Sequence, residues 1–321
     1  MREMKEMRVL HVNNIADVAG TLSRAQREIG MSSEVAAVKW RYSSAVDHPI
    51  PPDPPGLANM RLFFWILRNL HRYDLLHYHG RVGLTALYYK TRRIPAVLHF
   101  HGSELRDSNK VRFTSFARWA FVSTPDLIRH AHKVNVDPVE YLPNPVFLEG
   151  IYPVNIERRG EEVEGGRPPV VVHLPTDRRV KGTANLLEAV EILRSEGIDV
   201  DLRIVEEVEP EKALRRMREA DIVVDWISPR FEIYGMVSIQ AMAMGIPVVC
   251  HIDPALYPKR PPLEVVEPSA EGVAEGLKRL IRRAKGWGGM GRRERRYVEA
   301  THDAIKIAKR VKEVYEEVLT R

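Results

Sequence analysis

The chain has 321 residues, of which 44% are hydrophobic and 29% charged; this is enough apolar material for about two domains and excludes a disordered chain. Its single cysteine, Cys250, excludes a disulfide framework and a cysteine-rich metal site. No stretch has the ~20 apolar residues of a membrane span, and residues 1–8 lack a signal-like apolar core, so we expect a soluble, cytoplasmic protein.

The net charge of +6 is concentrated in the first half of the chain. Residues 1–150 hold 20 Lys and Arg against 14 Asp and Glu, whereas residues 151–321 hold 29 of each kind. A basic first half suits an anionic partner such as phosphate groups, nucleic acid or lipid headgroups. Only two glutamines stand beside abundant Glu and Arg, which indicates a thermophilic source.

Short apolar runs alternate with helical patterns through the first half. This alternation predicts strands over 9–12, 34–38, 74–79, 96–101 and 121–123. It predicts helices from about Thr21, and over 60–70, 83–90 and 112–120. The proline-rich residues 50–56 are predicted to be a loop. Strands separated by helices of this size indicate a parallel sheet with helices on both faces.

The pattern stops in a polar, glycine-rich segment near residues 153–167, where we place a domain boundary. It resumes with strands predicted over 169–174, 202–205, 222–227 and 247–251, and helices over 183–196, 210–219, 236–244 and 270–285. Residues 301–303 are typical of a cap for a last helix that ends near Leu319.

We therefore predict an α/β chain of two doubly wound parallel-sheet domains that face a cleft. The expected divisions are an N-terminal domain over 1–150, a linker over 151–168, a C-terminal domain over 169–295 and a C-terminal helix over 296–321. Ligands of such sheets bind outside the carboxyl ends of the strands.

The segment 231–249 carries the most specific pattern in the chain. A loop ends at Gly235, a helix starts there, and Gly245 stops that helix before a buried strand. The free amides and the positive dipole end at this helix start suit a phosphate group. Glu232 and Gln240, eight residues apart, offer oxygens to sugar hydroxyls. The pattern alone favours an ordinary loop–helix–strand unit whose Met and Ala side chains are core, and both interpretations stay open.

This segment resembles the C-terminal signature of the retaining family 4 glycosyltransferases, which have the GT-B fold of two facing Rossmann-like domains. Glu232, residues 234–237 and residues 241–249 match the signature in register, while Gln240 stands where the family has a second glutamate. The resemblance implies that Glu232 contacts the donor sugar and Gln240 the ribose hydroxyls. It also implies that the first amides of the helix contact phosphate, namely those of Gly235, Met236 and Val237.

Further stretches match the family in order and spacing. Lys181 matches a lysine that neutralises the diphosphate, and Thr176 takes the place of the arginine that accompanies it. Arg178 or Arg179 is the candidate substitute for that arginine, with a solvated arginine pair as the alternative.

Four other matches complete the resemblance. His101, in the sequence His-Phe-His-Gly, matches a histidine that touches the donor sugar, and Gly20 matches a glycine of the turn before the first helix. Residues 142–146 resemble the crossover into the second domain. The final helix resembles the one that returns to the first domain in this fold.

The resemblance implies a hexosyltransferase-type enzyme that transfers a sugar, with retention, from a nucleotide-sugar donor to a glycan or lipid-linked acceptor. Such an activity belongs to polysaccharide or glycolipid biosynthesis. We expect the first domain to hold the acceptor and the second the donor, and we expect no cofactor or metal to be required. His101 and Glu232 are the catalytic candidates, acting by positioning, and no residue is assigned to nucleophilic attack.

Two other functions stay open. The first is a non-catalytic GT-B scaffold that binds a nucleotide sugar or a partner. It stays open because Thr176 and Gln240 stand where the family has an arginine and a glutamate. The second is a metal-dependent hydrolase. It would use two pairs of histidines at strand ends, His77 with His79 and His99 with His101, together with Asp225. The domain break near Arg159 argues against the hydrolase.

Two surface features concern partners. The helix over 60–70 combines apolar residues with Arg61 and Arg68, which suits either peripheral contact with an anionic membrane or packing inside the domain. The basic stretch 282–296 is rich in glycine and is interpreted as a hinge before the last helix. We expect no nucleic-acid partner, because no nucleic-acid-binding signature accompanies that charge.

Overall fold

The structure is a computed structural model that describes residues 7–38, 46–80, 94–107, 111 and 114–320. The chain divides into two compact units. Unit 1 comprises Met1–Phe147 and Asp303–Arg321, and unit 2 comprises Leu148–His302. The last stretch of chain therefore belongs to the same unit as the first.

Unit 1 is built on a seven-stranded sheet in the order β3-β2-β1-β4-β5-β6-β7, with every neighbouring pair parallel. Its central strands are buried, which matches the continuous apolar runs seen in the sequence. The strands are β1 (Arg8–Val12), β2 (Ser32–Val38), β3 (His48–Ile50), β4 (Leu75–His79), β5 (Ala96–Phe100), β6 (Trp119–Val122) and β7 (Val139–Tyr141).

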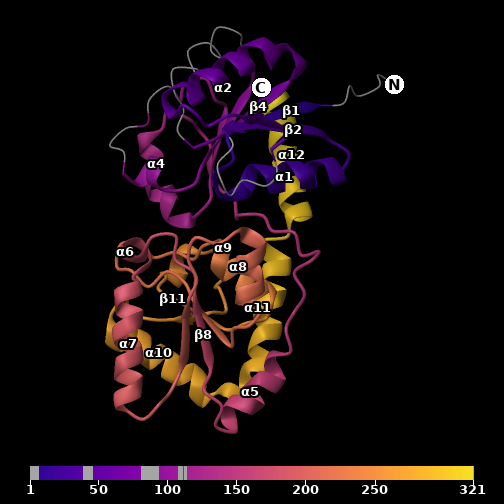
Figure 1. The fold of residues 1–321 in the computed structure, drawn as a ribbon. Helices are drawn as coiled ribbons and strands as arrows, with labels where there is room; N and C mark the ends of the chain where they lie inside the picture. Colours follow the sequence, from indigo (N-terminus) through magenta and orange to yellow (C-terminus); the bar gives the residue numbers. More distant parts are fainter. Residues whose placement is uncertain (1–6, 39–45, 81–93, 108–110, 112–113, 321) are drawn as a thin grey trace. The chain divides into compact units, whose positions relative to one another are not determined.

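Helices cover both faces of this sheet (Figure 1). Side chains alternate along each strand, so Val9 and Leu75 meet α1 and α12 on one face, while Leu10 and Leu76 meet α2 on the other. The helices are α1 (Val18–Glu28), α2 (Pro55–Asn69), α4 (Ser103–Arg106) and α12 (Ala304–Thr320), with 3₁₀ segments η1 (Ile15–Asp17), η2 (Leu70–Arg72) and η3 (Pro125–Lys133).

Unit 2 is built on a five-stranded parallel sheet in the order β12-β11-β10-β8-β9. Its strands are β8 (Val170–His173), β9 (Asp201–Ile204), β10 (Ile222–Val224), β11 (Val248–Cys250) and β12 (Glu264–Val265). Its helices are α5 (Ile156–Glu164), α6 (Arg178–Lys181), α7 (Thr183–Ser195), α8 (Pro210–Met217), α9 (Met236–Ala243), α10 (Ala270–Arg282) and α11 (Trp287–Thr301), with η4 (Pro254–Leu256) and η5 (Ala284–Gly286). Each unit is thus a Rossmann-like α/β layer structure, as predicted.

The segment 151–168 is not a linker, because it contains α5. The side chain of Asn155 caps this helix by accepting a hydrogen bond from the amide of Arg158 at 3.2 Å. Ile156, Gly160 and Val163 are buried on one side of the helix, which lies beside α11 (Figure 1). Three buried positions are enough for a short helix to pack on a neighbouring helix. Because the residues around them are polar, the composition of this segment did not predict a helix.

The basic stretch 282–296 is not a hinge, because α11 runs through it. Gly288 lies against the side chain of Glu157, and Gly291 lies against the backbone of Gly245. These glycines allow α11 to approach its neighbours closely, and a side chain at either position would collide with them. The predicted helix over 296–321 is therefore two helices that meet at His302, one in each unit.

Three smaller predictions also need correction or fall outside the description. No helix spans the described part of 112–120, where a turn at 115–116 leads into β6, and residues 112–113 lie outside the described residues. The stretch 50–56 is not all loop, because β3 ends at Ile50 and α2 begins at Pro55. The predicted helix over 83–90 lies outside the described residues.

Candidate functional site

The carboxylate of Asp225 joins two parts of unit 2 that lie far apart in the sequence. Its Oδ1 accepts a hydrogen bond from Nζ of Lys181. Its Oδ2 accepts hydrogen bonds from the amide of Gly235 at 3.2 Å and from the amide and hydroxyl of Ser238 at 3.2 and 2.6 Å. Lys181 follows β8 and Asp225 follows β10, and these neighbouring parallel strands end at the same edge of the sheet.

The ion pair between these two side chains is buried, with exposed fractions of 6% for Lys181 and 0% for Asp225. Burial alone would raise the pKa of Asp225, but the Lys181 ammonium and the hydrogen bonds hold that pKa below its ordinary value. The ammonium also lies 3.9 Å from the centre of the Trp226 ring. A charged carboxylate therefore occupies an anion-binding position formed by a lysine and a helix start.

Two amides of the first turn of α9 make no hydrogen bond within the described part of the chain. They belong to Met236 and Val237, which are both half-buried. The sequence predicts that these amides and that of Gly235 bind phosphate. The structure brings them together with Lys181, but the amide of Gly235 already donates to Asp225.

The two residues expected to contact sugar hydroxyls are both half-buried. The backbone carbonyl of Glu232 accepts a hydrogen bond from the amide of Asp253 at 3.4 Å. The side-chain amide of Gln240, on α9, makes no hydrogen bond to any described residue. Gln240 therefore has its donor and acceptor atoms available for a ligand.

The two arginines expected to replace the family's arginine lie on the surface of α6. Nε of Arg178 donates to both carboxylate oxygens of Glu206, at 2.9 and 3.0 Å. Arg179 is 94% exposed and lies 3.9 Å from Asp177. Thr176 is also exposed. Both arginines thus pair with surface carboxylates rather than with the buried Asp225.

Tyr234 makes contacts that the sequence pattern does not suggest. Its side chain is 3% exposed, and its hydroxyl lies 2.9 Å from the hydroxyl of Tyr297 and 2.9 Å from Nε2 of His302. The amide of Tyr234 donates to the hydroxyl of Tyr257 at 3.3 Å. The loop before α9 is therefore tied to the end of α11. A tyrosine, with its polar hydroxyl, between Ile233 and Gly235 was the available signal.

In unit 1, Gly20 lies in the first turn of α1 and not in the preceding turn. Its amide donates to Oδ1 of Asn14 at 3.1 Å. The turn itself is formed earlier, where Asn13, Ala16 and Asp17 adopt positive φ angles of 69°, 51° and 58°. The placement predicted for Gly20 is thus wrong by one helical turn, because non-glycine residues supply the left-handed conformations.

His101 follows β5, and its ring is held on both sides. Its Nε2 lies 3.0 Å from Nδ1 of His79, and its Nδ1 lies 2.8 Å from the hydroxyl of Ser123. Its backbone amide donates to the carboxylate of Glu104. Burial lowers the pKa of His101 to about 3, so the ring is neutral at physiological pH.

The histidine pairs lie on one face of the sheet, as predicted. The ring centroids of His77 and His79 lie 4.5 Å apart, and those of His99 and His101 lie 4.4 Å apart. Asp225, which the hydrolase hypothesis adds to them, belongs to unit 2 and uses both oxygens on Lys181 and α9. Both oxygens of that carboxylate are therefore already bonded within unit 2.

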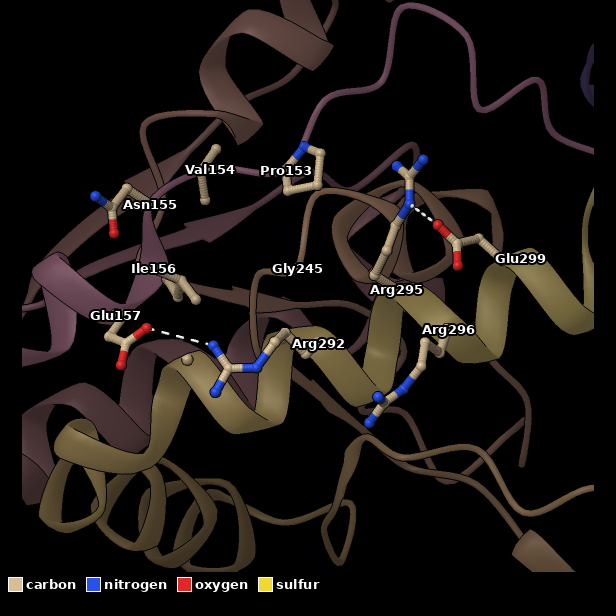
Figure 2. Close-up of a pocket in the computed structure, with 12 residues that line it drawn as sticks. Pro153, Val154, Asn155, Ile156, Glu157, Gly245, Arg292, Arg295, Arg296 and Glu299 are labelled. Carbon is tan, nitrogen blue, oxygen red and sulfur yellow. Dashed lines mark hydrogen bonds and ion pairs between the residues drawn. The ribbon is translucent and has the colours of Figure 1, made fainter.

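A pocket of about 400 Å³ lies elsewhere in unit 2, beside α11 (Figure 2). Gly245 lines it, so it lies at the carboxyl end of α9, whereas Lys181 and Asp225 lie at the amino end. Arg292 donates to Glu157 at 3.3 Å across the pocket, and Arg295 donates to Glu299 at 2.7 Å (Figure 2). The pocket is therefore separate from the candidate site.

Comparisons with known proteins agree with this architecture. Residues 16–149 match the family model described as Glycosyltransferase Family 4. A comparison with curated protein sequences finds no match. The whole chain is similar to the solved structure of sucrose-phosphate synthase from Thermosynechococcus elongatus, with 15% identity, a TM-score of 0.70, and coverage of 98% of this chain and 99% of that chain.

Two further solved structures show the same architecture. Anabaena Alr3699/HepE in complex with UDP-glucose is 14% identical, with a TM-score of 0.69 and coverage of 97% of this chain and 100% of that chain. A structure described as a putative UDP-N-acetylglucosamine 2-epimerase from Listeria monocytogenes is 14% identical, with a TM-score of 0.58 and coverage of 96% and 95%. These similarities establish the GT-B fold of the whole chain, and the family match agrees with the resemblance over residues 16–149.

Proposed function

We propose that this GT-B protein, which matches Glycosyltransferase Family 4 over residues 16–149, transfers a sugar from a nucleotide-sugar donor to a glycan or lipid-linked acceptor. The match within unit 1 and the fold of the full chain support the class of activity. The Anabaena structure contains UDP-glucose, which makes uridine nucleotide sugars the first donors to test. Fold alone does not decide the reaction, so the proposal depends on the site.

The observation that carries the proposal is the convergence of Lys181 and the start of α9 on one anion. The lysine ammonium and the amide of Gly235 both reach the carboxylate of Asp225. A phosphate oxygen placed close to that carboxylate would find the same donors, and the amides of Met236 and Val237 supply two more. A helix start with an adjacent lysine is a well-suited phosphate site.

In the proposed reaction these groups act on the leaving nucleotide. As the bond from the anomeric carbon to the diphosphate breaks, negative charge develops on the phosphate oxygens. The ammonium of Lys181 and the α9 amides would stabilise that charge without a metal ion. Gln240 would hold the ribose hydroxyls, and Glu232 and His101 would position the donor sugar. We propose transfer with retention of the anomeric configuration, as in the retaining family that the sequence resembles.

The surface of α2 supports a lipid-linked acceptor. Leu57, Met60 and Phe64 are 44%, 51% and 59% exposed, although large apolar side chains are ordinarily buried. Their spacing of three and four residues places them on one side of the helix, together with the exposed Arg61 and Arg68. An apolar stripe flanked by cations suits the surface of an anionic membrane. No described helix is long and apolar enough to cross a bilayer.

A specific observation favours a second candidate, a scaffold that binds without transfer. Asp225 neutralises the lysine that the diphosphate needs, and it also takes the amide of Gly235. A donor must displace or share these bonds. Together with Thr176 and Gln240 in place of charged residues, this would lower the affinity for a nucleotide sugar.

The deciding experiment has two readouts on the full-length protein. Ligand-observed NMR with a panel of nucleoside diphosphates and their sugars, with and without magnesium, measures binding. Release of the nucleoside diphosphate in the presence of extracted lipids or glycans measures transfer. Metal-independent binding with acceptor-dependent release supports the enzyme. Binding of a donor without release of the nucleoside diphosphate supports the scaffold. The absence of both binding and release rejects the donor site.

A further inference from the structure

Five histidines form a continuous group on one face of the unit 1 sheet. His11 on β1 pairs in register with His77 on β4, and His79 on β4 pairs with His99 on β5. His101 follows one residue after β5. Because side chains on a strand alternate, all five rings lie on the face that α1 and α12 cover. The first four are fully buried, and His101 is partly exposed.

A chain of hydrogen bonds runs through this group from one end to the other. Nδ1 of His11 lies 3.0 Å from Nε2 of His79, and Nδ1 of His79 lies 3.0 Å from Nε2 of His101. The hydroxyl of Ser123 lies 2.8 Å from Nδ1 of His101 and 3.0 Å from Nε2 of His99. At the other end, Oε1 of Gln26 lies 2.8 Å from Nε2 of His11.

Gln26 gives this chain a direction. Its Nε2 donates to the hydroxyl of Tyr315 at 3.2 Å, so its Oε1 is the acceptor that faces His11. Nε2 of His11 must then carry the proton, and each further ring donates through Nε2 and accepts through Nδ1. In this arrangement Nδ1 of His79 accepts from Nε2 of His101, and the lone pair on each Nδ1 points toward its neighbour.

Two ring nitrogens of the five-histidine group are buried and have no hydrogen-bond partner among the described residues. They are Nδ1 of His99 and Nε2 of His77. His79, His99 and His101 each offer a ring nitrogen, and the three nitrogens lie within 4.8 Å of one another. A buried ring nitrogen without a partner is costly in a core, whereas three histidines that each bring a nitrogen to one place suit a cation.

We propose that His79, His99 and His101 bind a transition-metal ion, with Zn²⁺ as the first candidate. Imidazole is a preferred ligand of Zn²⁺, and three protein ligands leave a fourth position for water or a substrate atom. Nδ1 of His79 and Nε2 of His101, now 3.0 Å apart, are close to the ~3.3 Å that a tetrahedral Zn²⁺ with Zn–N of about 2.0 Å requires. A ring nitrogen of His99 lies within 4.8 Å of both and moves closer when the ion binds.

The atoms behind the three ligands are already in place. With a metal bound, His79 keeps its bond to His11 through Nε2, while His99 and His101 both face the hydroxyl of Ser123 with their other nitrogen. Metal-bound histidines ordinarily have such a partner on the second ring nitrogen, which fixes the orientation of the ring. Binding moves the proton of His101 from Nε2 to Nδ1, so Nδ1 donates a hydrogen bond to the oxygen of Ser123. The hydroxyl hydrogen of Ser123 then turns away from His101, and no proton leaves the site.

A second triad, formed by His11, His77 and His79, also has three ring nitrogens within 4.8 Å. All three of its members are fully buried, whereas the proposed triad includes the partly exposed His101. An ion can enter, and a fourth ligand can bind, only from an exposed side. The proposed site is therefore the triad that contains His101.

This site is separate from the donor-binding residues of unit 2, so metal binding and nucleotide binding are measured independently. A metal on His101 would take that ring away from a donor sugar. The metal-loaded protein is therefore expected to transfer sugar more slowly while it binds nucleoside diphosphate unchanged.

The test is titration of the full-length, chelator-treated protein with Co²⁺, which reports tetrahedral coordination through its visible absorption. We expect an equimolar endpoint, displacement by Zn²⁺, no displacement by Mg²⁺, and a rise in Tm with Zn²⁺. His99→Gln should weaken binding by 100-fold or more. Ser123→Ala, which leaves the ligands in place, should weaken it by about 10- to 100-fold. His132→Gln, at an exposed histidine of the same unit, is the control and should bind as the parent does.

Three results would overturn the proposal. One is the absence of tetrahedral Co²⁺ absorption in the folded parent protein. Another is full binding in both His99→Gln and Ser123→Ala. The third is an equal loss in His132→Gln, which would place the metal on surface histidines. Circular dichroism of each variant shows whether it is folded, and Ser123→Ala keeps the test valid where His99→Gln does not fold.

Discussion

Lys181 and Asp225 form a buried ion pair at the first turn of α9, the position at which a phosphate would be held by the same donors. The pair is therefore both a structural element and a competitor of the proposed ligand. A diphosphate that binds there must attract Lys181 more strongly than an internal carboxylate does. The predictions for these two residues separate the two roles.

Asp225→Asn should raise the affinity for UDP by about 10-fold, which corresponds to about 1.4 kcal/mol. The amide oxygen can still accept from Gly235 and Ser238, but the lysine charge becomes available to phosphate. Isothermal titration of both proteins with UDP gives the comparison. Asp221→Asn is the matched control, because Asp221 is equally buried and bonds Arg167 in the same unit. Unchanged or weaker affinity in a folded Asp225→Asn variant contradicts the assigned competition.

Lys181→Met should lower UDP affinity by at least 10-fold and lower the free energy of unfolding by about 3–5 kcal/mol, because it leaves a buried carboxylate unpaired. The double variant with Asp225→Asn should recover most of the stability and none of the affinity. Urea denaturation and UDP titration of the single and double variants test this. If the double variant recovers both, Lys181 acts on stability alone.

Gln240→Glu should leave UDP binding intact or tighten it by a few-fold, because a carboxylate accepts two hydroxyl protons better than an amide does. The matched ligand is 2′-deoxy-UDP, for which the substitution should make a smaller difference. Competition titrations with both nucleotides measure the contrast. An equal effect on the two nucleotides would show that Gln240 does not contact the ribose.

Glu294 should make the protein less stable as the pH rises. Its side chain is 0% exposed, Oε1 accepts from the amide of Val248 at 3.3 Å, and Oε2 is buried without a partner among the residues that the structure describes. Burial raises the pKa of Glu294 well above its ordinary value. The unfolded chain releases this proton near pH ~4.3, so stability is full below that pH and falls as the pH rises toward the folded pKa.

Glu294→Gln should therefore stabilise the protein at pH 8 by about 1–3 kcal/mol and change little near pH 4. Urea denaturation at pH 8, 6 and 4.5 gives the dependence. Glu299→Gln is the control, since Glu299 is 45% exposed and pairs with Arg295. A stability difference that stays constant with pH would mean that Glu294 is not protonated in the folded protein.

Phe64→Ser should weaken binding to anionic lipid vesicles by about 10-fold, because a large apolar side chain leaves the proposed contact surface. Sedimentation with vesicles that contain phosphatidylglycerol measures the change. Leu187→Ser, on α7 of unit 2, is the matched control, since Leu187 is 43% exposed and lies on the other unit. Equal losses in both variants would remove α2 as the docking surface.

The sequence by itself determined the architecture and one motif. Apolar runs of strand length between helical patterns predicted most strands of both sheets, because burial on two faces leaves a strong local signal. The motif from Glu232 to Gly245 placed the start of α9 correctly, since Gly235 and the run that follows it mark a helix start within a few residues. Each of these features depends on contacts or propensities that are close in the chain.

Only the tertiary structure decided what the site residues bond. Asp225 meets Lys181 across two strands and 44 residues, and His101 meets His79 and Ser123 across 22 residues in each direction. Glycines at 288 and 291, which composition assigns to a hinge, instead allow α11 to pack closely. A side chain's partner is set by which strands lie side by side, and sequence patterns within one segment do not contain that information.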